Sequence, residues 1–432
     1  MSLSESTDYR WIDGVEGLEL YEPGGHHPVM IDDVLHNRYR IVDKLGFGGF
    51  STVWLARDLT KNRNLVVKVG RSSVGFPRKE TEILQALQTP KLPLPPGFEA
   101  NPQTNIPSIF DTFDVRGPNG THTCYTLTPA QGNLKEKSFS RLFPVQVARA
   151  LAAKLARAVA YVHSQGFVHG DIHLRNILIK FPSELDDLSL QEFRKMFGGP
   201  ETVPVTRVDN KPLTPNVPSH AVVPLNLGKY AEDFTIVDAH GLILSDFGQA
   251  FSPDTEQRLG KDCNTPVASR APETYFEPNR PISFSSDIWS LGTAIWEILG
   301  MKPLFSEIEE QDEVVAEQID VLGIHNLPAP WRRKWEGKDI DWENWNTEIP
   351  RLPFGKRTPW PVLEDAFQEC VQEDRREMVT EGVFEEGEET EAILELIRGM
   401  LTFNPEERWT IDMVLHSKWM AQWALPELEK TA

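Results

Sequence analysis

Hydrophobic and polar residues alternate along the first part of the chain. From residue 39 the stretch YRIVDKLGFGGFSTVWLARD alternates apolar and polar residues around glycines, and NLVVKV (64–69) adds a third β-rich run. Alternation with a period of two, bounded by glycine, is typical of strands. We therefore expect an antiparallel sheet over residues 39–69, followed by a helix over RKETEILQAL (78–87).

Helical periodicity dominates the rest of the chain. In QVARALAAKLARAVAYVHSQG (146–166), the apolar positions recur at steps of three or four residues, and Gly166 marks a helix end. The stretches 285–300, 313–323 and 390–420 show the same spacing. The pattern predicts a mainly helical second part, reached through a long amphipathic helix.

Two segments lack such patterns. Residues 1–38 form a turn-rich lead-in, and six prolines fall between residues 200 and 224. Proline cannot continue a helix or a central strand. We expect a surface insertion at about residues 182–238, partly flexible, with one helix near LSLQEFRKMF (188–197).

Size, charge and cysteine content narrow the function classes. A chain of 432 residues with 40% apolar content exceeds one typical compact core, so two or more lobes are expected. The net charge of −20 argues against a direct nucleic-acid partner and is compatible with a basic polypeptide partner, although an acidic surface also simply aids solubility. Three scattered cysteines suggest neither a disulfide framework nor a cysteine metal site. Since no uncharged apolar run approaches the roughly 18 residues of a membrane span, we expect a soluble cytoplasmic or nuclear protein.

A glycine-rich hairpin is the first candidate for chemistry. Gly46, Gly48, Ser51 and Val53 lie between two predicted strands. Small residues let backbone N–H groups approach phosphate closely. Alone, such a hairpin is more often a plain turn. Ser51 replaces a third glycine, which keeps the side chain small and adds a hydroxyl donor.

A lysine and a glutamate form the second candidate. Lys68 lies within the apolar strand VVKV, where burial requires a partner. Glu80 supplies one, because it lies on the same helix face as the apolar stripe formed by Ile83, Leu84 and Leu87. An edge-strand lysine that points to water remains the alternative.

A polar loop and an acid at a strand end form the third candidate. Asp171 and Asn176 lie in FVHGDIHLRNILI (167–179), which indicates strand, loop, strand, and Asp246 follows another predicted strand in SDFGQ. Asn176 and Asp246 could bind Mg²⁺ through oxygen atoms, and Asp171 could accept a proton from an attacking hydroxyl. Read alone, the loop could be a polar turn. With Ala-Pro-Glu (271–273), the ordered motifs form the protein kinase signature.

From about residue 39 to 420 the chain resembles eukaryotic protein kinases. The resemblance implies an α+β, bilobal fold, with a β-rich N-lobe carrying one regulatory helix, a mainly α-helical C-lobe, and ATP between them. The implied boundaries are 1–38 for an N-terminal extension, 39–130 for the N-lobe, 131–420 for the C-lobe with its Pro-rich insertion at about 182–238, and 421–432 for a C-terminal tail.

The same resemblance implies the site residues. Lys68 would pair with Glu80 and the α/β-phosphates, Asp171 would be the catalytic base, and Asn176 and Asp246 would hold Mg²⁺. The implied catalytic set is Asp171, Lys68, Glu80, His173 and Asn176. The implied ATP-binding set is Leu45, Gly46, Phe47, Gly48, Gly49, Phe50, Ser51, Val53, Lys68, Leu127, Thr128 and Ala130, in which Leu127 resembles the gatekeeper, and the Thr128 carbonyl and Ala130 amide face adenine. Asp287 resembles the residue that braces the catalytic loop, and Arg408 resembles the partner of Glu273.

A narrower resemblance is to the SR-protein kinases. These share a Gly-Gly-x-His-Pro-Val lead-in, found here at 24–29, and a Phe-Ser-Thr-Val-Trp glycine loop, found here at 50–54. They also interrupt the kinase domain between the catalytic loop and Asp-Phe-Gly. The resemblance implies phosphorylation of serine or threonine in basic Arg/Ser-rich proteins. We also expect a monomer, with neither nucleic acid nor membrane as partner. We expect the acidic run 385–389 to be a solvated loop rather than a docking groove.

Besides Ser51, three positions depart from the kinase pattern. Gly170 stands where an arginine would read a phosphorylated activation segment, so activity without such phosphorylation is expected. His173 stands where a lysine is usual, which would weaken phosphoryl stabilisation or make it pH-dependent. Thr265 lies one residue from the usual threonine, which leaves the substrate-orienting hydroxyl unassigned.

Two alternatives remain open from the sequence. The loop His-Gly-Asp-x-His-x-x-Asn is similar to that of aminoglycoside and choline kinases, which phosphorylate small molecules. The substitutions at Ser51 and His173 are also compatible with a weakly active pseudokinase scaffold. The kinase residues that oppose this interpretation are Lys68, Asp171, Asn176 and Asp246.

Overall fold

The computed structural model describes the chain in several stretches. These are residues 8–73, 76–90, 105–181, 188–226, 229–300, 302–336, 358–378 and 382–430. The outermost parts of the expected extension and tail (1–7 and 431–432) and parts of the expected insertion (182–187 and 227–228) lie outside the described residues.

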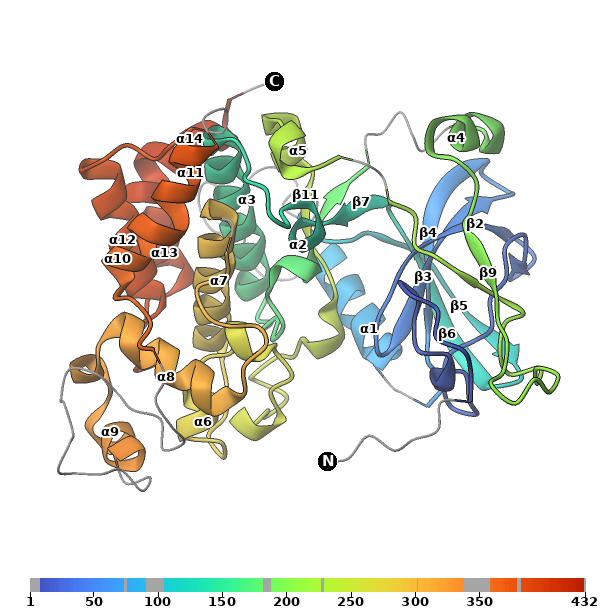
Figure 1. Ribbon diagram of the computed structural model, residues 1–432, viewed down its shortest axis with the longest axis horizontal. Coiled ribbons are helices and arrows are strands. Elements are labelled where there is room, and N and C mark those ends of the chain that lie inside the picture. Colours follow the sequence, from blue (N-terminus) through green and yellow to red (C-terminus); the bar gives the residue numbers. More distant parts are fainter. Residues whose placement is uncertain are drawn as a thin grey trace. The chain divides into compact units, whose positions relative to one another are not determined.

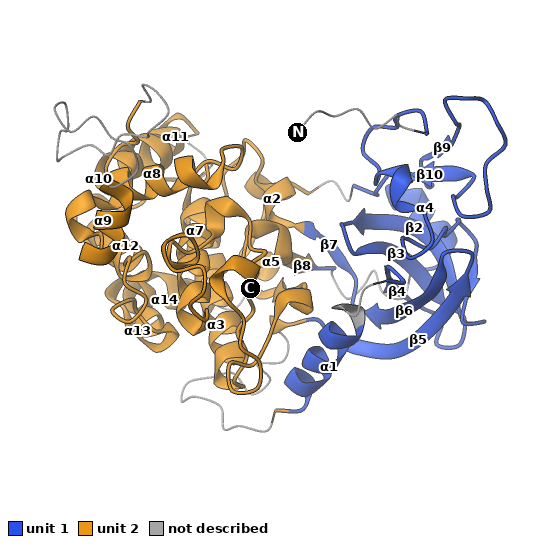
Figure 2. Cartoon of the chain, turned by 90° about the horizontal axis from the view of Figure 1, so that it is seen from below, with its two compact units in different colours: residues 1–89, 107–132, 180–228 blue, residues 90–106, 133–179, 229–432 orange. Residues whose placement is uncertain are grey.

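The chain forms two compact units (Figure 2). Unit 1 contains residues 1–89, 107–132 and 180–228, and unit 2 contains residues 90–106, 133–179 and 229–432. Most of the insertion, which we expected within the C-lobe, therefore belongs to the β-rich unit.

Unit 1 is built on a six-stranded antiparallel sheet with strand order β1-β2-β3-β4-β6-β5 (Figure 1). Its strands are β1 (Val34–Leu35), β2 (Tyr39–Phe47), β3 (Ser51–Asp58), β4 (Arg63–Gly70), β5 (Ile109–Gly117) and β6 (Gly120–Leu127), and β7 (Ala130–Asn133) follows. Helix α1 (Phe76–Gln88) packs on β5 and β6. The predicted sheet over residues 39–69 and the predicted helix over 78–87 are confirmed.

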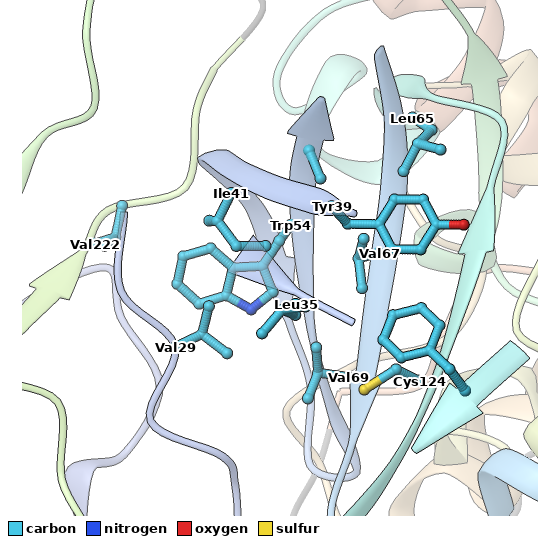
Figure 3. Packing of buried hydrophobic residues seen from close by; sticks show 12 residues of the cluster. Val29, Leu35, Tyr39, Ile41, Trp54, Leu65, Val67, Val69, Cys124 and Val222 are labelled. Carbon is cyan, nitrogen blue, oxygen red and sulfur yellow. The ribbon is translucent and has the colours of Figure 1, made fainter. Parts of the chain in front are cut away.

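The insertion contributes to the core of unit 1. Trp54 of β3 lies among Val29, Ile41 and Val222 (Figure 3), so the lead-in and the insertion both reach the face of the sheet. Helix α4 (Leu190–Phe197) places Phe193 in a second cluster that contains Val42 and Leu55. The predicted helix at 188–197 is confirmed, but the expected surface insertion is instead packed into the hydrophobic core.

Local sequence explains where the elements of the insertion begin and end. Ser189 caps α4, and Glu192 completes a capping box by bonding back to the Ser189 N–H. Gly198, with φ of +87°, ends this helix. Strands β9 (Thr202–Pro204) and β10 (His220–Val222) pair in antiparallel fashion, and three of the six prolines lie in the segment that connects them.

Three histidines of unit 1 are packed in its interior. His26 and His122 are fully buried, and the rings of His27 and His122 lie 4.9 Å apart. Burial lowers the pKa of His26 to about 4 and that of His27 to about 4, and it also lowers the pKa of His122. These side chains are therefore neutral in the folded protein near pH 7.

This arrangement predicts loss of stability in mild acid. An imidazole in the unfolded chain binds a proton below about pH 6.5, whereas folded His26 and His27 resist protonation until about pH 4. The free energy of unfolding should therefore fall as the pH drops through this window, by about 2 kcal/mol per histidine at about pH 5. Thermal or urea unfolding at pH 7 and pH 5 measures the difference.

His26→Phe provides the control for this prediction. Neither ring nitrogen of His26 has a hydrogen-bond partner in the described part of the chain, so an apolar ring can replace the imidazole. The variant should lose about 2 kcal/mol less than the wild type between the two pH values. An equal loss in both proteins would show that His26 is not responsible.

Unit 2 is mainly helical, and several of its helices pack against helix α3 (Figure 1). Its helices are α2 (Leu134–Lys137), α3 (Val145–Ser164), α5 (Ile236–His240), α6 (Glu273–Phe276), α7 (Phe284–Leu299), α8 (Gln311–Leu322), α9 (Ala329–Glu336), α10 (Leu363–Phe367), α11 (Glu373–Glu377), α12 (Glu388–Met400), α13 (Ile411–His416) and α14 (Leu425–Leu428). Strand β8 (Ile177–Lys180) pairs antiparallel with β11 (Leu242–Leu244). Helix α3 ends just before Gly166, whose φ of +82° matches the predicted helix stop. No described helix has the length and apolar character needed to span a bilayer.

The acidic run of unit 2 is only partly solvated. Glu385, Glu386 and Glu388 are exposed, as expected for a solvated loop. Glu389 is instead fully buried and accepts hydrogen bonds from Arg149 at 2.6 and 2.8 Å. This carboxylate therefore connects α12 to α3 within the helical unit.

Candidate active site

The glycine-rich hairpin of unit 1 has open space where side chains would lie. An added Cβ at Gly46, Gly48 or Gly49 would meet no atom of the described chain within 4 Å. None of the three has a positive φ, so the backbone does not demand glycine either. Neither packing nor conformation requires these glycines, and the open space beside them leaves room for a ligand to approach the backbone closely.

Hydrogen bonds hold the tip of this hairpin. Gly48 N–H donates to Ser51 O at 2.9 Å, and Arg71 binds the carbonyl oxygens of Gly49 and Phe50 at 3.2 and 2.9 Å. The rings of Phe47 and Phe50 are exposed, while Leu45 and Val53 are half-buried at the base of the hairpin. The tip is therefore shaped by hydrogen bonds to its backbone groups rather than by apolar packing.

Lys68 forms an ion pair with Glu80. Its Nζ lies 3.0 and 2.9 Å from the two carboxylate oxygens, and both side chains are largely buried. Strand β4 lies between β3 and β6, and Lys68 is in register with Val53 and Tyr125. The alternative of an edge-strand lysine is therefore wrong, and the predicted pairing is confirmed.

The segment expected to face adenine lies at the end of β6. Leu127 is the last residue of this strand, and Ala130 begins β7. Phe181 N–H donates to Pro129 O at 3.0 Å, so the one backbone hydrogen-bonding group of Pro129 is used inside unit 1. The roles of Leu127, Thr128 and Ala130 toward adenine stay predictions.

In unit 2, Asp287 braces the catalytic loop from helix α7. Its carboxylate accepts hydrogen bonds from His169 N–H at 2.7 Å and Gly170 N–H at 2.8 Å. His163 Nε2 lies 2.9 Å from the same group. The bracing role expected for Asp287 is confirmed.

His169 connects the catalytic loop to the strand that precedes Asp246. Its Nδ1 accepts from Asp171 N–H at 3.2 Å, so Nε2 is the donor to Ser245 O at 3.1 Å. Complete burial lowers the pKa of His169, which agrees with a neutral ring. Ser245 in turn donates to Asn176 O through both its N–H (2.8 Å) and its hydroxyl (2.9 Å). These bonds hold the strand end that carries Asp246 beside the loop that carries Asp171 and Asn176.

Asp171 has one committed oxygen and one available oxygen. Asn176 Nδ2 donates to Asp171 Oδ2 at 3.0 Å and to Asp171 O at 2.9 Å. Oδ1 has no hydrogen-bond partner among the described residues and lies 3.4 Å from His173 Nε2. A buried acceptor of this kind suits a proton from an incoming hydroxyl.

Asn176 and Asp246 fit a magnesium site. All hydrogen bonds of the Asn176 side chain are made by Nδ2, which leaves its carbonyl oxygen for a cation. Asp246 is exposed and holds a left-handed conformation with φ of 62° and ψ of 70°, a strained backbone for a non-glycine residue. Among the described residues no three His, Cys, Asp or Glu side chains cluster as metal ligands. A site with few protein oxygens suits Mg²⁺, which keeps several waters and substrate phosphates.

Side-chain hydrogen bonds tie the activation segment, which runs from Asp246 to Glu273, to the catalytic loop. Thr265 Oγ1 donates to Gly170 O at 2.8 Å, which gives the displaced threonine a structural contact. Arg258 bonds to Gln249 O, and its guanidinium lies over the Phe251 ring at 4.6 Å. A Cβ at Gly170, where φ is +75°, would lie 3.0 Å from Gln249 O and 3.6 Å from Arg258 Nη1. Arg258 therefore occupies the space beside the loop position that lacks an arginine.

Sequence reasoning missed Arg258 and Gln249. They are nine residues apart in a loop, and no periodic pattern relates them. The one signal in the sequence was Gly170 itself, which stands where an arginine is usual and so suggests that another cation lies nearby.

The Ala-Pro-Glu segment is anchored by a buried ion pair. Arg408 Nη1 and Nη2 donate to the Glu273 carboxylate at 2.9 and 2.8 Å. The predicted pairing of Arg408 with Glu273 is confirmed.

Comparison with known proteins identifies the fold and the family. The chain matches the protein kinase domain over residues 39–193 and 233–420. It belongs to the protein kinase family.

Several relatives support a serine/threonine protein kinase. A serine/threonine protein kinase of Aspergillus fumigatus is 26% identical over 94% of this chain and 90% of its own length. Protein kinase dsk1 of Schizosaccharomyces pombe is 36% identical over 38% of this chain and 30% of its own, and human SRSF protein kinase 3 is 32% identical over 37% and 28%. A crystal structure of a kinase domain, 19% identical, superposes with a TM-score of 0.58 over 91% of this chain and 98% of its own. The predicted α+β kinase fold and the SR-protein-kinase likeness are confirmed, and they favour a protein kinase over a small-molecule kinase.

His173 predicts a gain of activity on substitution. Lysine carries a compact ammonium with three donors, whereas an imidazole offers fewer donors and a more diffuse charge. His173→Lys should therefore raise kcat about three- to tenfold through charge stabilisation. Initial rates at saturating ATP measure this. His173→Gln, which supplies an N–H donor without a charge, is the control and should not raise kcat; a lysine variant slower than wild type would contradict the prediction.

Proposed function

We propose that this serine/threonine protein kinase transfers the γ-phosphoryl group of ATP with Mg²⁺, using Asp171 as the base. The observation that carries the proposal is the available Oδ1 of Asp171, fixed beside Asn176 and the strand that leads to Asp246. Bound Mg²⁺ neutralises charge on the phosphates.

The residues of unit 1 supply the nucleotide contacts. The hairpin glycines present backbone N–H groups to the phosphates, and Lys68, oriented by Glu80, binds the α/β-phosphates. Leu127 lines the adenine position, with the Thr128 carbonyl and the Ala130 amide on its polar edge.

The residues of unit 2 carry the transfer. Asn176 and Asp246 hold Mg²⁺, Asp171 accepts the hydroxyl proton, and His173 donates toward the transferring group. Because Asp171 Oδ2 is held by Asn176, its carboxylate has one orientation and Oδ1 faces the acceptor.

Basic Arg/Ser-rich proteins are the proposed substrates. The net charge of −20 would attract arginine-rich chains. The likeness to human SRSF protein kinase 3 supports the same class. A monomer that works in the cytoplasm or the nucleus is proposed as well.

The enzyme should be active without phosphorylation of its activation segment. Thr265 and Arg258 already fix this segment beside the catalytic loop, and Gly170 offers no side chain to a phosphate. Phosphatase treatment should leave the activity unchanged, and a loss above tenfold would contradict this part of the proposal.

The test combines transfer and binding. Labelled ATP, Mg²⁺ and an Arg/Ser-repeat peptide should give phosphoserine, and Mg-ATP should raise the melting temperature of the protein. Asp246→Asn should lose both effects, whereas the exposed control Asp412→Asn should keep both. No transfer to any peptide of an array, together with no thermal shift, would overturn the proposal and favour a scaffold. Transfer to acidic peptides alone would overturn only the substrate class.

A further inference from the structure

Two segments of unit 1 lie outside the stretches that match the kinase family. These are the lead-in segment, whose described part is 8–38, and residues 194–226, the described part of the gap in the family match (194–232) that belongs to unit 1. They form one cluster, in which Val15, Leu18 and Tyr21 of the lead-in pack against Val205, Val217 and Ala221. The two segments therefore act as one structural element added to the kinase sheet.

This element meets the sheet at Lys44, two residues before Gly46. The Lys44 side chain is almost fully buried and forms an ion pair with Glu16, and Tyr21 donates its hydroxyl hydrogen bond to the same carboxylate. Burial lowers the pKa of Lys44 and raises that of Tyr21. Within unit 1, Glu16 supplies the countercharge that this buried ammonium needs.

The backbone of Lys44 is held from the same side. Leu225 N–H donates to Lys44 O at 2.7 Å. The pairing of β2 with β3 shifts register between Lys44 and Gly46, which is a bulge at the start of the glycine-rich hairpin. A bulge bends its strand and changes the direction of the residues after it. The lead-in contacts the Lys44 side chain and the second segment contacts its carbonyl, at the place where the hairpin changes direction.

Lys44 also contacts the hairpin itself. Its Nζ lies 5.4 Å from the centre of the Phe47 ring and 5.1 Å from that of Trp54. Phe47 is exposed at the tip, and Trp54 is in register with Lys44 on β3. A cation over an aromatic ring is a directional contact, so the position of the ammonium affects both arms of the hairpin.

Stability alone does not explain this ion pair. A buried pair is commonly no more stabilising than apolar residues of the same size, and one established use of such a pair is to fix register and geometry. Here the pair lies at the bulge that sets the direction of the phosphate-binding hairpin.

We propose that the lead-in segment and residues 194–226 set the position of the glycine-rich hairpin for ATP, with Glu16 as a positioning residue that acts through Lys44. The proposal rests on the ATP-binding function assigned to this hairpin. The hairpin sequence alone would then not give full affinity for ATP. The bulge would shift when Lys44 loses its ion pair with Glu16 or its hydrogen bond from Leu225 N–H.

Steady-state kinetics separate positioning from simple destabilisation. Glu16→Gln removes the countercharge at constant size and should raise KM for ATP about five- to tenfold, with kcat and KM for the peptide within twofold of wild type. Tyr21→Phe keeps the ion pair and removes one hydrogen bond, so a smaller rise of about twofold or threefold is expected.

Arg38→Gln is the matched control, because it breaks an ion pair at the opposite end of the same two strands. Arg38 binds Asp58 at 2.8 and 2.9 Å, and the neighbouring Tyr39 is in register with Asp58. This variant should lower the melting temperature, by less than Glu16→Gln because the Arg38 side chain is partly exposed, and leave KM for ATP unchanged.

The outcomes are distinguishable. If wild type neither binds nor uses Mg-ATP, the proposed function fails and this inference fails with it. If wild type is active but folded Glu16→Gln has an unchanged KM for ATP, or the control raises KM equally, the positioning role is overturned while the kinase function stands. Should Glu16→Gln not fold, Tyr21→Phe decides: a raised KM for ATP supports the role, and an unchanged KM overturns it.

Discussion

Asp171→Asn is expected to lower kcat about a thousandfold while Mg-ATP still raises the melting temperature. The amide is the same size, so Asn176 Nδ2 keeps an oxygen to bind and the loop keeps its braces to Asp287. The variant lacks a basic oxygen at the position of Oδ1. The acceptor hydroxyl then has nowhere to transfer its proton, whereas the nucleotide contacts assigned to unit 1 are untouched.

Single-turnover transfer of labelled phosphate, with the thermal shift measured in parallel, checks this expectation. The exposed Asp412→Asn makes the same chemical change elsewhere in unit 2 and should leave both readings at the wild-type level. Activity above about a tenth of wild type in Asp171→Asn would show that another group accepts the proton. Loss of the thermal shift would instead show that Asp171 is needed for nucleotide binding.

Arg408→Met is expected to lower the free energy of unfolding of the protein by about 3–5 kcal/mol. Arg408 is fully buried and makes two hydrogen bonds to Glu273, one to Ser285 O at 2.8 Å, one to Thr402 O at 2.9 Å and one to Phe403 O at 3.1 Å. Methionine fills part of the volume but leaves a buried carboxylate and three carbonyl oxygens without this donor. Each unmet acceptor in the interior costs about 1–3 kcal/mol.

Chemical denaturation measures the loss, and Arg280→Met is the comparison. Arg280 pairs with Glu277 at 3.0 Å and Glu406 at 2.7 Å, but its side chain is 40% exposed. Its removal should cost about 1 kcal/mol or less, because water solvates the remaining carboxylates. Similar losses of unfolding free energy in the two variants would show that the burial of the Arg408 ion pair does not add to its contribution to stability. Activity of Arg408→Met should also fall, since Glu273 ends the activation segment.

Most of the site could be predicted from the sequence, because the residues of each motif lie within one short stretch of the chain. Asp171 and Asn176 share one loop, and the hairpin glycines share one turn, so spacing alone indicates their geometry. Lys68 and Glu80 were paired from strand position and helix face, which the 3.0 and 2.9 Å contacts confirm. Local periodicity determines which face a side chain occupies, and that is sufficient for such pairs.

Contacts between distant segments could not be predicted from the sequence. The prolines of the insertion correctly argued against helix and central strand, but they carry no information on packing, so Val222 in the core was unforeseen. Glu16 and Lys44 are separated by 28 residues, and Leu225 lies far beyond both. Glu389 in an acidic run likewise gives no local sign that Arg149 would bury it. Each of these contacts depends on which surfaces pack together in the folded chain. The periodicity of one segment carries no information about the segment that packs against it.

The interleaving of the two units has a consequence for how the chain folds. Unit 1 is assembled from three stretches, the last of which ends at residue 228, while part of unit 2 is synthesised between the second and the third. On the ribosome the β-sheet would therefore wait for Val222 and Leu225 until the catalytic loop has already emerged. High sequence separation of contacts slows folding, and until Val222 arrives the apolar face around Trp54 lacks part of its cover and is exposed to aggregation. Neither unit can be excised as one continuous piece, so expression of an isolated β-rich unit would require the insertion to be joined to it in a new order.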